Sequence, residues 1–502
     1  MITAIENIEL YRYEIHSLLK AFYPQEDVKV LTEADAAGSR KYREIAREPF
    51  LRVFFAEKNV TARFCDAGTS RPAAGSDDCR ASAPEGVSFM EKGPALKTAL
   101  KHLIYQMLAE REGRTLPWGE LIGIRPTKIA MQWLLEGKTV EEAAAAMERE
   151  HLVSPQKALL SAEIAQRERQ ILADIHYENG YSLYIGIPFC PTTCLYCSFP
   201  SFNLGIWRER VDEYLDALER EMRASAALMQ GRILDTIYVG GGTPTTLEPA
   251  QLARLFSMVE ANFPTGDLQE LTVEAGRPDS ITAAKLRVLK EHGVSRISVN
   301  PQSMKEETLR LIGRMHTVED VRRAFFLCRE EGFDNINMDI ILGLPEETEE
   351  DVRTTLKEIG KLSPDSLTVH SLAIKRGSRM QKYIAEKGFS SISNTDACMD
   401  VAAQAAASMG MEPYYLYRQK NISGNLENVG FARPGKAGIY NILIMEEKQS
   451  ILALGAGSIS KAVFPAEGRI ERSDNPKDVE TYMKNVDEMI GRKRRLAIGR
   501  QS

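Results

Sequence analysis

The chain has 502 residues, of which 43% are hydrophobic and 27% charged, and its formal net charge is −6. This is the composition of a globular protein of about two to four domains, and the acidic balance gives no electrostatic reason for binding nucleic acid or an anionic membrane. No uninterrupted run of about 18 apolar residues could span a bilayer, and the N-terminus lacks the basic segment and long apolar core of a signal peptide.

The cysteines point to a reducing compartment. There are seven, an odd number, and apart from one cluster they are widely spaced along the chain, which argues against a disulfide framework. Free thiols are typical of the cytosol. We therefore expect a cytoplasmic protein whose partners include neither nucleic acid nor a membrane.

Residues 1–175 have the pattern of a mixed α/β domain, to which the sequence assigns no role. Short apolar runs predict strands at Val28–Leu31 and Phe50–Phe55. Apolar residues at helical spacing predict one helix at Ala95–Arg111 and another from Pro155 to about Ile175.

The segment Asp66–Gly86 is rich in Gly, Ala, Ser, Pro and Asp. This composition predicts an exposed loop that has no apolar face to bury. Cys79 lies within the segment, and we expect it to be a surface thiol rather than a metal ligand.

From Tyr181 onward, strand and helix patterns alternate. One helical segment places Val211, Leu215 and Leu218 on a single face. Because the connections are long enough for crossovers, we expect a parallel sheet, either open or curled into a barrel. In both arrangements functional groups gather at the carboxyl ends of the strands. The six predicted strands are Ser182–Ile187, Thr236–Gly240, Leu271–Ala275, Arg296–Asn300, Asn335–Leu342 and Ser366–His370.

The alternation ends after about Gly377. An Ala-rich helix at Ala397–Met409 and a strand at Tyr414–Gln419 are predicted there, followed by a Gly-rich stretch. The basic residues 491–500 at the end of the chain are expected to form a solvated helix terminus or tail.

Three cysteines follow the first of the six strands: Cys190, Cys194 and Cys197, with no further cysteine until Cys328. Zinc sites usually combine one C-x2–4-C pair with a second pair farther along, and no such second pair is evident. Iron–sulfur clusters use closely spaced cysteines on a loop, and three thiolates would leave one iron of a four-iron cluster open to a small molecule. A zinc module and three unrelated structural cysteines are the alternatives.

The spacing C-x3-C-x2-C after a first strand resembles the signature of radical S-adenosylmethionine (SAM) enzymes. The resemblance implies a [4Fe–4S] cluster whose open iron binds SAM, and a 5′-deoxyadenosyl radical that abstracts hydrogen from the substrate. It also implies an α/β fold in which residues 176–376 form a partial (β/α)6 TIM-like barrel. The mixed α/β N-terminal domain, residues 1–175, would precede this core, and a smaller α+β region, residues 377–502, would cover the substrate.

The stretch Gly240–Thr245, GGGTPT, ends the second predicted strand. Its glycines let the backbone approach a ligand closely and adopt positive φ angles. It lacks the G-K-[ST] ending of a phosphate-binding loop, so an NTPase is not indicated. It resembles the glycine motif of radical SAM enzymes that contacts the methionine amino group, which assigns cofactor binding to Gly241, Gly242 and Thr243.

Further positions resemble the coproporphyrinogen dehydrogenase branch of these enzymes. Glu274 resembles the acid that meets the amino group of SAM, and Arg314 resembles the arginine that meets its carboxylate, a charge-assisted contact suited to a guanidinium. Gln302 and Asp339 resemble the ribose-binding pair of that branch. Each of these residues follows or ends a predicted strand.

Two tyrosines complete the set that the resemblance implies. Tyr184 is similar to a tyrosine near the cluster, to which we assign both a cofactor-binding and a catalytic role, and Tyr196 is expected beside the cofactor. Two departures from the branch affect loop shape: Asn300–Ser303 stands where G-V-Q-S is common, and Gly276 replaces the usual Asn or Asp.

The resemblance extends over about residues 181–465 and is strongest to the HemZ-type coproporphyrinogen dehydrogenases; Leu116–Ile129 also matches this type. The HemW-type heme chaperones carry an H-N-x-x-Y-W motif. The corresponding stretch here, Tyr440–Glu446, has neither histidine nor tryptophan, which weakens a heme-carrier interpretation.

The implied reaction converts two propionates of coproporphyrinogen III to vinyl groups without dioxygen, giving protoporphyrinogen IX. It needs an electron donor of the flavodoxin or ferredoxin kind and an electron acceptor. Because this tetrapyrrole carries four carboxylates, cationic groups are expected at the site. Arg418 is the first candidate, since Tyr415 and Tyr417 stand beside it in the sequence. The others are Arg376, Arg379, Lys420 and Arg433.

Two other functions remain open at this point. One is a heme-binding or heme-trafficking protein of the HemW kind. The other is a radical SAM enzyme that acts on a different tetrapyrrole.

Overall fold

The computed structural model describes residues 1–38, 50–65, 79–82, 88–90, 93–123, 125–375, 378–388, 394–419 and 425–496. The chain divides into two compact units, Met1–Ala162 and Glu163–Ser502. Helix α7 (Pro155–Ile171) contains the boundary between them. Within the described ranges, no helix combines the length and the apolar character needed to cross a bilayer.

The first unit is a five-stranded sheet with helices packed on an apolar core. Its strands are β1 (Ile2–Glu6), β2 (Val28–Thr32), β3 (Phe50–Phe55), β4 (Asn59–Cys65) and β5 (Cys79–Ser82), and its helices are α1 (Arg12–Phe22), α2 (Glu33–Gly38), α4 (Pro94–Glu112), α5 (Thr127–Leu135) and α6 (Val140–His151). The strand order is β2-β1-β3-β4-β5. Strand β1 runs parallel to β2 and β3, while β3, β4 and β5 pair antiparallel. Buried side chains of α1, β3 and α4, such as Leu18, Leu51 and Leu100, meet in the core.

Most sequence predictions for this unit are confirmed. The predicted strands are β2 and β3, and the predicted helices are α4 and α7, the latter ending at Ile171. The prediction for Asp66–Gly86 is wrong in part: Cys79 begins strand β5, which pairs with β4. Cys79 is half-buried against the apolar core, because backbone pairing at a sheet edge needs no apolar pattern. Residues 66–78 and 83–87 lie outside the described ranges.

The second unit contains an eleven-stranded sheet in the order β14-β15-β13-β12-β11-β10-β9-β6-β16-β17-β18. Its centre consists of six parallel strands that lie side by side in chain order. These are β6 (Gly180–Ile187), β9 (Ile233–Gly241), β10 (Glu270–Glu274), β11 (Arg296–Ser298), β12 (Ile336–Leu342) and β13 (Ser366–Ser371).

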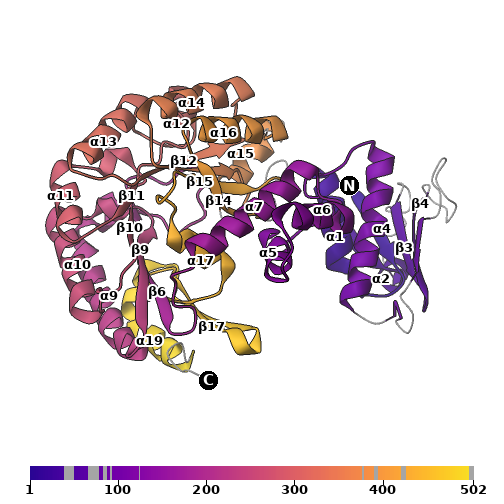
Figure 1. The fold of residues 1–502 in the computed structure, drawn as a ribbon, viewed down its shortest axis with the longest axis horizontal. Coiled ribbons are helices and arrows are strands. Elements are labelled where there is room, and N and C mark those ends of the chain that lie inside the picture. Colours follow the sequence, from indigo (N-terminus) through magenta and orange to yellow (C-terminus); the bar gives the residue numbers. More distant parts are fainter. Residues whose placement is uncertain are drawn as a thin grey trace. The chain divides into compact units, whose positions relative to one another are not determined.

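Helices connect these strands in chain order: α9 (Val211–Ala226), α10 (Pro249–Asn262), α11 (Ala283–Glu291), α12 (Glu306–Leu311) with α13 (Val318–Glu330), and α14 (Glu349–Leu362). Since each new strand adds on the same side and crossovers are right-handed, the helices cover one face of the sheet. Figure 1 shows α10, α11, α13 and α14 along the outer side of a curved row of strands. This arrangement confirms all six predicted strands and the α/β class with a partial (β/α)6 core.

The residues after 377 extend the same sheet on both sides. Strand β15 (Asn428–Ala432) pairs antiparallel with β13, and β14 (Glu412–Tyr417) pairs antiparallel with β15. Strand β16 (Ser450–Leu454) runs parallel to β6 and is followed by β17 (Ile459–Phe464) and β18 (Arg469–Asp474). The helices here are α15 (Met380–Lys387), the predicted Ala-rich α16 (Asp396–Ser408), α17 (Ile439–Glu446), α18 (Val479–Lys484) and α19 (Val486–Arg495). The division into domains at 175/176 and 376/377 stays a prediction.

The sequence predicts that the basic C-terminal segment is solvated, and this is wrong for part of the segment. Lys493 on α19 is fully buried and forms an ion pair of 2.6 Å with the fully buried Glu221 of α9. Tyr482 and Asn475 donate hydrogen bonds to the same carboxylate. The prediction failed because Met489, Ile490 and Lys493 share the buried face of an amphipathic helix, where a long lysine can reach a partner. Residues 497–502 lie outside the described ranges.

Candidate active site

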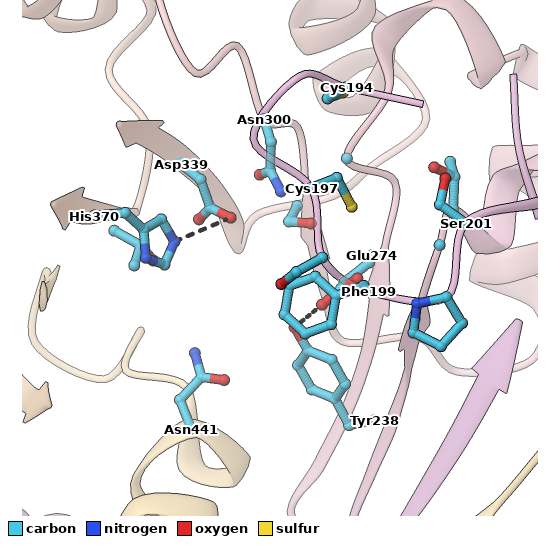
Figure 2. A pocket seen from close by; sticks show the side chains of 18 of the residues that line it. Cys194, Cys197, Phe199, Ser201, Tyr238, Glu274, Asn300, Asp339, His370 and Asn441 are labelled. Atoms are coloured by element: carbon cyan, nitrogen blue, oxygen red, sulfur yellow. Dashed lines mark hydrogen bonds and ion pairs between the residues drawn. The ribbon is translucent and has the colours of Figure 1, made fainter. Parts of the chain in front are cut away.

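A cavity of about 640 Å³ lies at the carboxyl ends of the six parallel strands. Alternate residues of each strand face it, as the period of two requires. Tyr184 of β6, Tyr238 of β9, Glu274 of β10, Ser298 of β11 and Asp339 of β12 all line it. Sequence-distant polar side chains are thereby brought to one place (Figure 2).

The three clustered cysteines sit on a loop that begins at this edge of the sheet. The loop is closed by a short parallel pair, β7 (Phe189–Cys190) with β8 (Phe202–Asn203). The thiols of Cys190, Cys194 and Cys197 all line the cavity. In the part of the chain that the structure describes, no three His, Cys, Asp or Glu side chains converge as ligands of a single metal ion would. A four-iron cluster takes each thiolate on a different iron, so convergence on one point is not required of its ligands.

Backbone contacts hold the cysteine loop from several sides. Thr192 donates a hydrogen bond from its hydroxyl to the carbonyl of Gly313 at 2.9 Å, and the Leu195 amide donates to the carbonyl of Ile312 at 2.9 Å. The guanidinium of Arg379 donates to the carbonyl of Thr193. These contacts join the cysteine loop to the residues that follow α12 and to Arg379.

Burial makes two of the three thiols weak acids. It raises the pKa of the Cys190 thiol, and it raises the pKa of Cys197 to about 11. Thiols in this state are protonated at neutral pH, whereas a metal ligand must be a thiolate. A metal bound by these thiols would therefore release protons, and it would supply the charge compensation that buried thiolates need.

The glycine stretch packs directly against the cysteine loop. The amide of Gly242 donates to the carbonyl of Ile187 and that of Thr243 donates to the carbonyl of Phe189, both at 2.8 Å. The Thr243 hydroxyl lies 3.4 Å from the Cys190 Sγ. A Cβ on Gly242 would lie only 2.6 Å from the Phe189 carbonyl oxygen, so the approach requires a glycine.

Glu274 ends β10 inside the cavity and accepts a hydrogen bond of 2.6 Å from the Tyr238 hydroxyl. Burial raises its pKa to about 7, with a further contribution from the negative charge of Asp339, although the Tyr238 hydrogen bond opposes the shift. This carboxyl is poised to ionise when a cation binds beside it.

Gln302 and Asp339 lie next to each other because their backbones are bonded. The Gln302 amide donates to the carbonyl of Asp339 at 2.9 Å, and the Ile341 amide donates to the carbonyl of Gln302 at 3.0 Å. Gln302 has a φ of 68°, a left-handed conformation that costs a non-glycine residue about 1–3 kcal/mol. This strained backbone position lies where the side chain of Gln302 reaches the cavity.

His370 of β13 stands beside Asp339. The distance from His370 Nε2 to Asp339 Oδ2 is 3.7 Å, and the Tyr417 hydroxyl lies 3.3 Å from the other ring nitrogen. Burial raises the pKa of Asp339, but the hydrogen bond and charge of His370, together with hydrogen bonds from Asn337 and Thr368, outweigh it and leave that pKa below its usual value. In Figure 2 this acid–histidine pair lies at the left of the view and the Glu274–Tyr238 pair lies near its centre.

Arg314 is buried at the end of the cavity nearest the cysteine loop. It donates to the carbonyls of Gly276 at 3.2 Å and of Asn300. Tyr196 also lines this end and interacts with Arg314. Gly276 leaves room for the Asn300 amide, which a Cβ there would approach to 3.0 Å. The two departures from the resembled branch thus lie against each other in the structure.

Tyr184 belongs to a stack of three tyrosines that lines the cavity. Its ring lies parallel to that of Tyr238 at 6.2 Å, and Tyr238 in turn stacks on Tyr440 of α17 at 4.6 Å. Tyr440 was not selected from the sequence, because nothing local distinguishes it from a core tyrosine.

Of the cationic residues expected from the sequence, the described ones, Arg379, Arg418 and Arg433, do not line the cavity. Arg418 is 4% exposed, does not line it, and donates to the carbonyl and side-chain oxygens of Asn425 at 3.0 and 2.8 Å. The strand alternation explains this, since Tyr415, Tyr417 and Gln419 face the cavity and the residue between them points away. Arg433 instead donates hydrogen bonds to the carbonyl of Met409 and to the hydroxyl of Ser363. Arg376 and Lys420 lie outside the described ranges.

Other cations do line the cavity: Arg277, Arg296, Lys375 and Lys461. Lys375 stands over the ring of Phe199, with its ammonium 5.5 Å from the ring centroid, and burial lowers its pKa. Only Arg277 had a usable sequence signal, because it follows Gly276 at the end of a strand.

The cavity fits a polar nucleoside-like ligand beside a thiolate-bound group. Six residues that line it have a buried polar atom with no hydrogen-bond partner among the described residues: Arg296 Nε, Ser298 Oγ, Asn300 Oδ1, Gln302 Oε1, Arg314 Nε and Gln419 Oε1. Buried polar atoms normally have partners, so these mark positions where a ligand would bind.

Comparison with known proteins agrees with this geometry. The family model of the radical SAM superfamily matches residues 184–359. The chain is 41% identical to the oxygen-independent coproporphyrinogen-III oxidase-like protein HemZ of Bacillus subtilis (strain 168), over 77% of this chain and 78% of HemZ. It is 30% identical to the heme chaperone HemW of Escherichia coli (strain K12), over 60% of this chain and 75% of HemW.

Among solved structures, the coproporphyrinogen III oxidase HemN from Escherichia coli, a radical SAM enzyme, is similar in fold and sequence. The match has a TM-score of 0.50 and 26% sequence identity, and it covers 65% of this chain and 72% of that one.

Proposed function

The chain belongs to the radical SAM superfamily, within the group that contains HemN, HemZ and HemW, and from this premise we propose that it oxidatively decarboxylates coproporphyrinogen III without dioxygen. Each of two propionates would lose a hydrogen atom from its β-carbon, carbon dioxide and one electron, and become a vinyl group. The product would be protoporphyrinogen IX. An electron donor of the flavodoxin or ferredoxin kind and a separate acceptor complete the balance.

The cofactors of the superfamily are a [4Fe–4S] cluster and SAM. We assign Cys190, Cys194 and Cys197 as the ligands of three irons, with the fourth iron left for SAM. Bound together, the two cofactors supply a 5′-deoxyadenosyl radical that abstracts hydrogen. The thiols' place on a loop anchored by backbone hydrogen bonds supports this assignment.

The remaining site residues bind and orient. Glu274, with its pKa of about 7, is assigned to the ammonium of SAM, and Arg314 to the carboxylate of SAM. The backbone of Gly241, Gly242 and Thr243 forms the wall on which the methionine part rests. The unpartnered amide oxygen of Gln302 and the carboxylate of Asp339 are assigned to the ribose.

The substrate assignment depends most on one observation: the cavity continues beyond the cysteine loop over stacked aromatic rings. The rings of Tyr184, Tyr238 and Tyr440 lie nearly parallel, with centroids 4.6–6.3 Å apart, and all three line the cavity. An aromatic wall of this kind suits a large tetrapyrrole. Lys375 lines the same cavity and can pair with a propionate, taking the place expected for Arg418. Lys461 also lines it, but its ammonium pairs with Glu447 at 3.0 Å. Enclosure also excludes water, which would otherwise quench reactive species.

The test is anaerobic incubation of the reconstituted chain with coproporphyrinogen III, SAM and a reductant, followed by mass analysis. We expect 5′-deoxyadenosine and protoporphyrinogen IX to form together. Cys194→Ala should abolish both and lose iron, while Cys328→Ala, which removes a buried thiol of α13, should retain both. Cleavage of SAM with coproporphyrinogen III untouched would refute the proposed substrate.

A second candidate is heme binding or trafficking, which the similarity to HemW favours. Retention of heme at one equivalent per chain, without turnover of coproporphyrinogen III, would support it. A changed tetrapyrrole other than protoporphyrinogen IX would instead indicate a radical SAM enzyme with a different substrate of that class.

A further inference from the structure

Arg277 joins the end of β10 to the cysteine loop. It is 3% exposed and lines the cavity. Its Nη1 donates to the carbonyl oxygen of Thr192 at 3.2 Å and to the hydroxyl of that residue at 3.1 Å, and it lies 4.0 Å from the Sγ of Cys194. Each of these three acceptors belongs to the cysteine loop.

The other side of the guanidinium is held by a carboxylate. Nε and Nη2 of Arg277 donate to the two oxygens of Asp279 at 3.1 and 3.0 Å. The backbone here is also fixed, because Ser280 donates to the Arg277 carbonyl at 2.7 Å and Thr245 of the glycine stretch lies 2.6 Å from the Ser280 hydroxyl. One side of the forked guanidinium therefore binds Asp279 and the other binds the cysteine loop, an arrangement that the single ammonium of lysine cannot reproduce.

The charge of Arg277 lies next to one thiol of the triad. A second guanidinium, that of Arg314, also interacts with the Cys194 thiol, and it donates further hydrogen bonds to the carbonyls of Gly276 and Asn300. Reduction of an iron–sulfur cluster adds one negative charge, and N–H groups directed at a ligating sulfur favour the reduced state. The carboxylate of Asp279 offsets part of the positive charge.

We propose that Arg277 is a positioning residue that fixes the Cys194 segment of the loop and raises the reduction potential of the cluster, and that Asp279 limits the size of this effect. The inference rests on the proposed assignment of Cys194 as a cluster ligand. It goes beyond that assignment because it gives the potential a dependence on two residues that are not assigned as ligands of the cluster.

The experiment is a redox titration of the reconstituted full-length chain, followed by electron paramagnetic resonance, with the iron content measured in parallel. Arg277→Gln removes the cation and should lower the midpoint potential. Asp279→Asn removes the opposing carboxylate and should raise it. Arg277→Lys keeps the charge but loses the fork, so its potential should lie between those of the parent and Arg277→Gln. Arg287→Gln, on the exposed side of α11 with its side chain 62% exposed, is the matched control and should leave the potential unchanged.

The outcomes separate this inference from the ligand assignment. If Arg277→Gln binds the full complement of iron at the parent potential, the inference is overturned while the assignment of Cys194 stands. If Arg277→Gln cannot hold iron, Asp279→Asn decides: an unchanged or lowered potential overturns the electrostatic part, and a raised potential supports it. Full iron loading of Cys194→Ala would overturn the ligand assignment itself.

Discussion

Glu274 ends β10 in the cavity, and its ionisation is linked to whatever binds beside it. Burial raises the pKa of this carboxyl from 4.5 to about 7. A group whose pKa is raised by folding contributes stability that is fully present below its unfolded pKa and is lost as the pH rises through its folded pKa. The unliganded protein therefore holds a destabilising carboxylate at pH 8, and a bound cation would compensate it.

Glu274→Gln tests this coupling. The glutamine can still accept the Tyr238 hydrogen bond, so the unliganded variant should be more stable than the parent at pH 8, by about 1–3 kcal/mol, and similar to it at pH 5. For the parent, SAM affinity should fall about tenfold for each pH unit below 7, since only the ionised carboxyl attracts the ammonium. Titration calorimetry in buffers of different ionisation enthalpy measures the affinity and the released proton. A parent affinity that does not change between pH 6 and pH 7 would contradict the assigned role.

The sequence allowed site residues to be selected where they belong to a short local motif. The three cysteines were selected from their spacing, and the glycines and the acid at the end of β10 from the family resemblance that these short motifs carry; all of them line the cavity except Gly240. Arg418 was misjudged, because its neighbours in sequence are tyrosines that face the cavity while its own side chain faces the other side of the strand. The alternation of side chains along a strand shows that Arg418 and the two tyrosines point in opposite directions. Which of the two directions leads into the cavity could be known only after β14 was placed in the sheet.

At the level of elements, the cysteine loop and the glycine stretch form one unit. Each depends on the other for backbone partners, since Gly242 and Thr243 donate to carbonyls of the residues that lead into Cys190. The contact is close enough that the glycine stretch carries a steric requirement as well as a conformational one: Gly241 has a φ of 110°, and Gly242 has no space for a Cβ.

Gly242→Ala should separate the two segments. Its Cβ would lie 2.6 Å from the Phe189 carbonyl oxygen and 3.0 Å from the Cys190 Sγ, and the backbone cannot yield without moving the first thiol. We expect a loss of about 1–3 kcal/mol of stability and a clear fall in bound iron after reconstitution. Gly266→Ala, where a Cβ would meet no atom within 4 Å, is the matched control. Thermal melting and iron analysis measure both effects, and a variant with parent-like iron content would show that the loop tolerates the shift.

On the scale of the whole molecule, the second unit is closed by a buried polar network near its C-terminal end. Glu221 of α9 accepts from Lys493 at 2.6 Å and from the Gly455 amide at 2.8 Å. Gly455 precedes residues that line the cavity, among them Ala456 and Ser458. The network therefore ties the last described helix, the first helix of the parallel core and one wall of the site together.

Lys493→Met should leave the Glu221 carboxylate buried without its cation. Removing one partner of a buried pair costs about 3–5 kcal/mol, and the loop at residues 455–458 should become more mobile. Arg494→Met, an exposed neighbour on the same helix, should change stability by no more than about 0.5 kcal/mol. Denaturant unfolding and hydrogen exchange of residues 450–460 give the two measurements. Equal stability of the two variants would mean that the ion pair contributes nothing beyond helix packing.

The sequence by itself determined the six strands of the parallel core, the helices between them and the position of the cysteine loop, because strand alternation, helical spacing and motif spacing are all properties of neighbouring residues. It also indicated the edge of the sheet at which the site forms, since parallel strands share their carboxyl ends. The radical SAM resemblance followed from those local patterns alone.

Only the tertiary structure decided which distant residues meet. Arg277 lies 83 positions from Cys194, and Lys493 lies 272 positions from Glu221, so no local pattern links them. Strand β16 pairs with β6 across the chain, and α17 brings Tyr440 to the stack on Tyr238. Such contacts depend on how whole elements pack, and burial then sets the pKa values and charge pairs that local sequence does not encode.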